Sequence, residues 1–118
     1  LITDSMRAAG MPEGEYRLGS LSKGQTVIVE DGVAKLADRS AFAGSVATAD
    51  RLVRTMIHLA EVPLTDAITM ITSTPARILG MDSSIGHIRP GYNADIVIFD
   101  DNINICRTII GGKTVHSI

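Results

Sequence analysis

The spacing of apolar residues changes twice along this chain, and each change limits the fold. β-Branched residues crowd positions 26–29, three- and four-residue spacing governs positions 48–79, and extended spacing returns from position 85. A strand alternates its side chains between two faces, whereas a helix repeats every 3.6 residues. The sequence therefore predicts a strand and a hairpin, then three helices, then a β-meander, which is an α/β arrangement.

Composition and charge exclude several classes of protein. A length of 118 residues suits one ordinary domain, and 45% apolar with 20% charged residues is typical of a globular chain. The net charge of −2 provides no basic field for nucleic acid or an anionic membrane. No apolar run approaches the roughly 20 residues of a transmembrane helix. We therefore expect neither a nucleic-acid nor a membrane partner. The single cysteine, Cys106, excludes an internal disulfide and fits a cytoplasmic location.

The first half of the chain contains one strong turn and two loops. Asp31-Gly32 lies between two apolar runs, and this dipeptide favours a hairpin because both residues tolerate positive φ. Residues 1–4 resemble the end of a short buried strand that stops at Asp4. Residues 6–24 are rich in glycine and serine, which predicts a long loop.

The second half contains the helices and the meander. We expect one helix to begin near Thr48 or Asp50, a second to follow Pro63, and a third to begin at Thr74-Pro75 and end at Gly80. Residues 85–88, 96–99, 103–109 and 113–116 have extended spacing and predict strands.

Few residues have a pattern that indicates chemistry. An Asp directly after a short apolar strand is where parallel α/β barrels place catalytic groups, although Asp4 could equally cap the following turn. Gly44-Ser45 would allow the backbone to approach a ligand closely, yet this dipeptide is common in loops. The three histidines, His58, His87 and His116, stand apart and have no metal-ligand spacing. Cys106 has no neighbouring base, so we interpret it as an inert strand residue.

The Thr3-Asp4-Ser5-Met6-Arg7 opening and the Ala43-Gly44-Ser45 loop are the most specific motifs of the chain. Through these motifs the chain resembles the N-acetylglucosamine-6-phosphate deacetylases of the amidohydrolase superfamily. Residues 74–80 and 86–97 resemble amidohydrolases more widely. The remaining matching segments are 12–16 and 31–34.

The resemblance implies a fold and a division into domains. The chain would be the C-terminal part of a metal-dependent (β/α)8 TIM-barrel amidohydrolase plus part of its small β-sandwich domain. Residues 1–80 would supply the last barrel strand, a β-hairpin insertion and helices, and residues 81–118 would supply strands of the sandwich. The absence of a methionine before Leu1 suggests the interior of a longer sequence.

The resemblance also implies a function and a site. The parent enzyme would remove the acetyl group from N-acetylglucosamine 6-phosphate in amino-sugar catabolism, giving glucosamine 6-phosphate and acetate. Asp4 would be the general acid and base, and Phe42, Ala43 and Gly44 would line the sugar site through main-chain groups. Phe42 stands where a Leu is more usual. A divalent metal, zinc or iron, would be held by a Glu and two His from upstream of residue 1.

Two consequences and two alternatives follow. The isolated chain would be inactive because a barrel cannot close on its final elements alone, and it would self-associate to cover unpaired strands. The substrate would be a small amino-sugar phosphate, and a homo-oligomer is expected. The alternatives are another amidohydrolase, such as a dihydroorotase-like enzyme, or a small α+β interaction module without catalysis.

Overall fold

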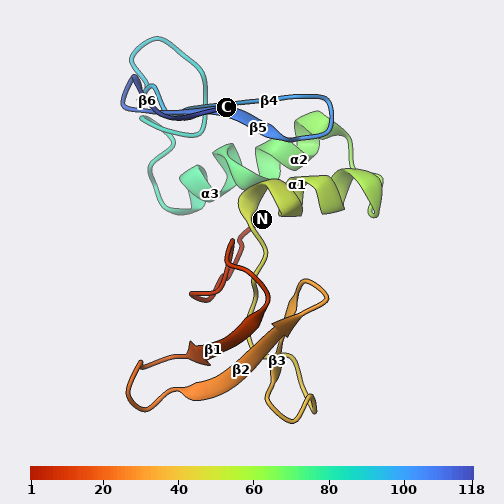
Figure 1. The fold of residues 1–118 in the computed structure, drawn as a ribbon. Helices are drawn as coiled ribbons and strands as arrows, with labels where there is room; N and C mark the ends of the chain where they lie inside the picture. Colours follow the sequence, from red (N-terminus) through yellow and green to blue (C-terminus); the bar gives the residue numbers. More distant parts are fainter. The chain divides into compact units, whose positions relative to one another are not determined.

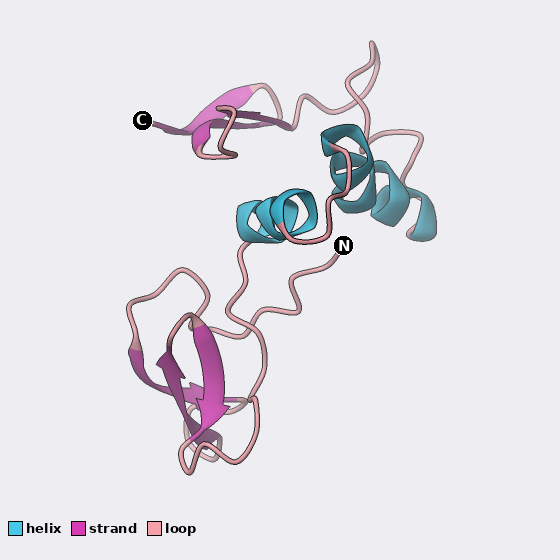
Figure 2. Cartoon of the chain, turned by 90° about the vertical axis from the view of Figure 1, so that its right-hand side faces the viewer, coloured by secondary structure: helices cyan, strands magenta, loops and turns pink.

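The computed structural model describes all 118 residues, which form two compact units. The N-terminal unit comprises residues 2–49, and the C-terminal unit comprises residues 50–118 together with Leu1. Their strands form two separate three-stranded antiparallel sheets (Figure 1, Figure 2). The expected assignment of residues 1–80 and 81–118 to a barrel and a sandwich stays a prediction, because contacts within this chain do not test it.

The N-terminal unit is built on the sheet β1-β2-β3, with β2 in the centre. The strands are β1 (Gly14–Leu18), β2 (Gln25–Glu30) and β3 (Val33–Leu36). The Asp31-Gly32 hairpin is confirmed, since the two residues have φ of 53° and 69°, as this turn requires. Its core contains Ala8, Val29 and Ala34.

Two N-terminal predictions are wrong. Residues 1–4 form no strand, because a strand needs a ladder of backbone hydrogen bonds and this part of the chain makes only one isolated bridge, at Ser5. The predicted loop 6–24 contains strand β1. Its Tyr16 and Leu18 alternate with exposed residues, but glycines and serines on either side conceal this short pattern in the sequence.

The C-terminal unit joins three helices to the second sheet. The helices are α1 (Ala49–His58), α2 (Leu64–Ile71) and α3 (Ser73–Ile78), and the strands are β4 (Ile96–Phe99), β5 (Ile105–Ile110) and β6 (Lys113–Ser117). The three helices and these three strands confirm most of the expected order. None of the helices combines the length and apolarity needed to cross a membrane.

A small core connects these elements. Val53 of α1 and Ala67 of α2 are buried against Ile103, which lies in the turn between β4 and β5, and Phe99 packs against the same cluster. Ile103 has φ of 61°, an unusual conformation for a β-branched residue. Arg54 of α1 donates a 2.8 Å hydrogen bond to the carbonyl oxygen of Ile103 and pairs with Asp50. The turn is therefore held by apolar packing against α1 and α2 and by a hydrogen bond from α1.

Two boundaries differ from the sequence prediction. Helix α3 begins at Ser73 with Thr72 as its N-cap, so Pro75 is the third helical residue rather than the first. The predicted strand 85–88 is absent. Gly86 has φ of 86°, and a Cβ there would lie 2.9 Å from the Cβ of Ala76 in α3. The chain turns against the helix at this point and cannot extend.

Candidate functional site

Asp4 lies in an irregular segment with an unusual backbone conformation. Its φ is 47°, in the left-handed region that Asp enters more readily than most residues. The residue is exposed to solvent. Backbone strain of this kind clusters at functional sites, where the surrounding contacts maintain it.

The residues after Asp4 join this segment to the loop at residues 42–45. Ser5 forms a parallel bridge with Ser45, and the N–H of Met6 donates a 2.8 Å hydrogen bond to the Ser45 carbonyl. The Ser5 hydroxyl donates to the carbonyl oxygen of Ala47. Asp4 and Gly44 each precede the bridged pair by one residue. The bridge therefore joins the segment that contains Asp4 to the loop that contains Gly44.

The loop itself is fixed to strand β3. Phe42 pairs with Lys35, and the N–H of Ala43 donates a 2.9 Å hydrogen bond to the carbonyl oxygen of Ala34. Ala43 is buried, whereas Phe42 is 78% exposed. The N–H of Ala43 is thus used within the protein and is not available to a ligand.

Gly44 and Met6 are in close contact. Gly44 has φ of 88°, and a Cβ at this position would lie 3.4 Å from the Cγ of Met6 and 3.5 Å from the Cδ1 of Leu18. The Met6 sulfur accepts a hydrogen bond from the N–H of Ala8, which folds its side chain back toward the buried cluster. The positive φ favours a glycine here, whereas a Cβ would make only ordinary van der Waals contacts.

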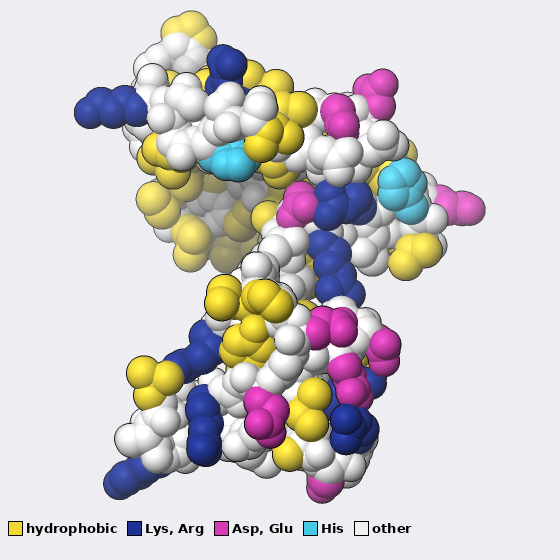
Figure 3. All heavy atoms as spheres, in the orientation of Figure 1, with side chains coloured by type: hydrophobic (Ala, Val, Ile, Leu, Met, Phe, Trp, Pro, Cys, Tyr) yellow, Lys and Arg dark blue, Asp and Glu magenta, His cyan; other side chains and the backbone are white.

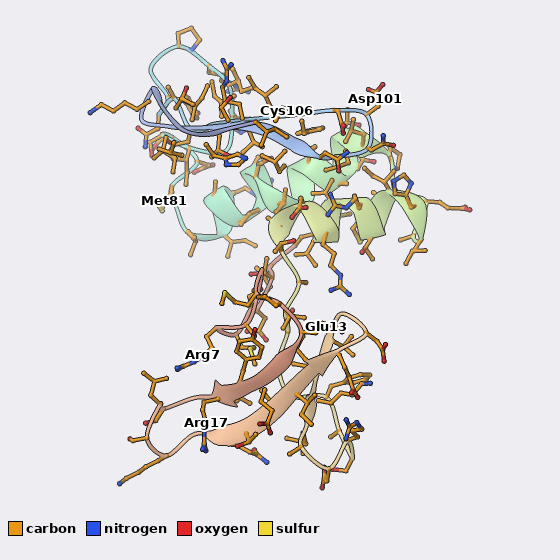
Figure 4. The ribbon with its side chains drawn as sticks, viewed as in Figure 1. Arg7, Glu13, Arg17, Met81, Asp101 and Cys106 are labelled. Carbon is orange, nitrogen blue, oxygen red and sulfur yellow. The ribbon has the colours of Figure 1, made fainter.

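Arginines and a tyrosine attach the loops of the N-terminal unit to its strands. Arg7 donates to the carbonyl of Gly19, and Arg17 donates a 2.9 Å hydrogen bond to the carbonyl of Gly24 (Figure 4). The Tyr16 hydroxyl donates to the carbonyl oxygen of Pro12. The Asp4 segment therefore rests on a sheet whose own connections are fixed by side chains.

The strongest electrostatic feature lies on the hairpin. Glu30 accepts hydrogen bonds from Arg39 at 2.8 Å and from Lys35 at 3.1 Å. These bonds, that of Arg39 first, lower the pKa of Glu30 from 4.5 to about 2. The same pairing raises the pKa of Arg39. The bonds join the two strands of the hairpin and the loop after β3, so we interpret the group as structural.

Sequence reasoning gave no role to Ser5 or Met6 and did not predict their pairing with Ser45, which connects the two predicted parts of the site. All three occur in the motifs that carry the resemblance. Their pairing depends on one bridge between distant segments, and no local pattern predicts such a bridge.

The residues of this chain do not fit the divalent metal that the resemblance implies. No three His, Cys, Asp or Glu side chains gather where they could hold an ion. His58 lies on α1, His116 lies on β6, and His87 packs edge-on against Tyr92 with ring centroids 5.9 Å apart. Cys106 is half-buried on β5, and its thiol contacts the carbonyl oxygen of Asn104 at 3.6 Å. We assign no metal ligand to this chain.

Residues 21–115 match the model of the amidohydrolase family. The chain belongs to this family.

The relatives that the chain matches are named as deacetylases of amino-sugar 6-phosphates. The chain is 40% identical over 113 residues to N-acetylglucosamine-6-phosphate deacetylase of Lysinibacillus sphaericus, covering 96% of this chain and 28% of that protein. It is 39% identical over 113 residues to N-acetylgalactosamine-6-phosphate deacetylase of Escherichia coli O157:H7, covering 96% of this chain and 29% of that protein. The chain thus spans less than a third of the length of both.

A solved structure of a deacetylase superposes closely on this chain. N-acetylglucosamine-6-phosphate deacetylase from Pasteurella multocida superposes with a TM-score of 0.87 at 26% identity, over 96% of this chain and 28% of that one. The resemblance and the fold class predicted from the sequence, part of a TIM-barrel amidohydrolase, are both confirmed.

Proposed function

We propose that this chain forms part of the active site of a deacetylase acting on an N-acetylated amino-sugar 6-phosphate. The observation that supports the proposal is the pairing of Ser5 with Ser45, which joins the segment of Asp4 to the loop of Gly44. Two relatives with 39% and 40% identity are named as deacetylases of such sugars. No observation favours the dihydroorotase-like alternative or the interaction module.

Asp4 is proposed as the group that transfers protons. Its carboxylate accepts a proton from water as the oxygen attacks the acetamide carbonyl carbon. When the C–N bond of the tetrahedral intermediate breaks, Asp4 returns that proton to the departing amine. The products are the free amino sugar and acetate, and Asp4 ends the cycle ionised. Its exposure on a segment fixed at Ser5 and Met6 suits this role.

The loop formed by Phe42, Ala43 and Gly44 is proposed to line the sugar site. Because Ala43 is buried and its N–H is bonded to Ala34, contacts with the sugar would come from Phe42 and Gly44. Gly44 has no side chain, so a ligand can approach its backbone closely.

Three further properties belong to the proposal. The metal would be zinc or iron and would be bound by residues other than those of this chain. The protein would act in the cytoplasm as a homo-oligomer.

Apolar side chains on β4, β5 and β6 are exposed, among them Val97, Ile110 and Val115, and Figure 3 shows hydrophobic side chains at the surface of the C-terminal unit. We expect this surface to be covered by self-association of the purified chain, and a strictly monomeric species in analytical ultracentrifugation would contradict that.

The test is a chimera of the Lysinibacillus sphaericus deacetylase in which the matched region is replaced by this chain. We expect the folded chimera to release acetate from N-acetylglucosamine 6-phosphate, and the 118 residues alone to release none with zinc or iron added. A folded chimera without turnover would contradict the proposed function. Turnover by the chain alone would contradict the expectation that these residues are inactive by themselves.

A further inference from the structure

The turn between β2 and β3 contains the only Asp-Gly step of the chain, Asp31-Gly32. In such a step the backbone nitrogen of the glycine can attack the side-chain carboxyl carbon of the aspartate, because glycine has no Cβ to obstruct the approach. The Asp31 side chain is 87% exposed, and its carboxylate lies 3.6 Å from the ammonium nitrogen of Lys35. Water therefore reaches the carboxyl group.

The reaction open to this step is isomerisation through a cyclic imide. A bond forms between the Gly32 nitrogen and Cγ of Asp31, and one carboxyl oxygen leaves as water with the amide proton and the proton of the carboxylic acid. A second water molecule then opens the ring. When this water breaks the bond between the Gly32 nitrogen and the main-chain carbonyl carbon of Asp31, the backbone continues through Cβ and Cγ. The product is isoaspartate, and no reactant other than water is needed.

A side chain from outside the turn holds the attacking nitrogen. The N–H of Gly32 donates a 3.0 Å hydrogen bond to Oε1 of Glu13 (Figure 4). Glu13 directly precedes β1, whose first residue, Gly14, pairs with Val29 of β2. The bond therefore connects the turn to the opposite edge strand of the sheet.

We propose that Asp31-Gly32 is a site of spontaneous isoaspartate formation and that Glu13 is the positioning residue that slows this reaction. The cyclic imide has no N–H, so the ring cannot form unless the bond between Gly32 and Glu13 is lost. Loss of a hydrogen bond to a charged acceptor adds to the barrier. The inference does not depend on the proposed function, because neither the turn nor Glu13 belongs to the candidate site.

The modification has a structural consequence for the loop at residues 42–45. Isoaspartate adds one carbon atom to the backbone of a two-residue turn, which disturbs the pairing of Glu30 with Val33 that closes the hairpin. Strand β3 in turn holds the loop, since the N–H of Ala43 donates a 2.9 Å hydrogen bond to the carbonyl oxygen of Ala34. A chain modified at Asp31 therefore has a less firmly attached loop.

Peptide mapping of the chimera tests the proposal. After incubation at physiological temperature and pH, trypsin releases residues 24–35 as one peptide, in which chromatography and fragmentation separate aspartate from isoaspartate. Glu13→Ala should form isoaspartate at Asp31 roughly fivefold faster than the unmodified sequence does. Glu13→Gln keeps an oxygen that accepts from Gly32 and should stay close to the unmodified rate. In water enriched in oxygen-18, the isoaspartate peptide should gain one heavy oxygen.

Two controls separate the role of Glu13 from a general loosening of the hairpin. Glu30→Gln removes the charge that pairs with Arg39 and Lys35 but leaves the bond between Glu13 and Gly32 in place. A rise in rate equal to that of Glu13→Ala would overturn the role of Glu13. In urea, where the turn is unfolded, Glu13→Ala and the unmodified sequence should isomerise at the same rate, and a difference there would also overturn it. Absence of isoaspartate at Asp31 in folded Glu13→Ala would overturn the site itself.

Discussion

The backbone N–H of Met6 donates a 2.8 Å hydrogen bond to the carbonyl oxygen of Ser45, which joins two segments separated in sequence by the whole sheet β1-β2-β3. The Ser5 hydroxyl adds a bond to Ala47 on the same side. Hydrophobic contacts beneath this junction involve Ala8 and Val46. The sheet therefore acts as a support that keeps Asp4 and the loop at Gly44 in register.

Replacing Asp4 by Asn removes the proposed proton acceptor while the residue keeps its shape and its tolerance of positive φ. We expect kcat of the chimera to fall by about 10²–10⁴-fold. The rate is measured as acetate release. The matched control is Asp31→Asn, since Asp31 is also an exposed Asp with positive φ, at 53°, but lies in the hairpin turn. Wild-type turnover in Asp4→Asn would remove Asp4 from the mechanism.

Local signals in the sequence predicted much of the fold because the interactions concerned are local. Asp31-Gly32 specifies its turn through φ alone, and the stripe containing Val53 specifies the buried face of α1. Strand β1 escaped prediction because a few alternating residues lie among glycines. Residues 85–88 have a strand-like composition, yet the close approach of Gly86 to Ala76 decides their conformation.

The candidate site, like the fold, could be predicted only in part from the sequence. Asp4 and the loop 42–44 were found through resemblance, since neither has a local pattern that separates a catalytic residue from a capping residue. Their juxtaposition depends on the Ser5–Ser45 bridge, a single long-range pairing. Such a pairing is set by how the sheet folds and not by neighbouring residues.

Gly44→Ala tests whether the loop conformation matters for function. A side chain at φ of 88° costs about 1–2 kcal/mol, and its Cβ would contact Met6. We expect the variant chimera to lose catalytic efficiency because the backbone beside Asp4 must shift. Gly10→Ala is the control, with a similar φ of 73° and nothing within 4 Å of its Cβ. It should cost similar stability and leave kcat/KM unchanged. Equal losses of activity in both variants would show that strain alone is responsible.

The ion-paired Glu30 predicts a pH dependence of stability. Because its pKa is about 2 in the folded state and 4.5 ordinarily, the folded protein binds fewer protons between these values than the unfolded chain does. The stabilisation is complete above pH 4.5 and is lost as pH falls toward 2. Glu30→Gln should therefore speed amide hydrogen exchange in β2 and β3 at pH 6, and the difference from wild type should shrink as the pH falls below 4.5. Glu15→Gln, at an exposed position of β1, is the control. A difference that persists unchanged at the lowest pH would contradict the assignment.

The buried turn at Ile103 predicts the largest stability effect in the C-terminal unit. Ile103 is 4% exposed and packs between Val53 and Ala67, so Ile103→Ala leaves a cavity beneath the turn. Such truncations cost about 2–5 kcal/mol, and part of this loss is offset because Ala at φ of 61° is less strained than a β-branched residue. We expect a net loss of about 2–3 kcal/mol, measured by hydrogen exchange of the α1 and α2 amides. Ile98→Ala makes the same truncation at a site that is 46% exposed on β4, and it should cost less than about 1 kcal/mol. Equal losses in the two variants would mean that the Ile103 cluster does not hold the sheet to the helices.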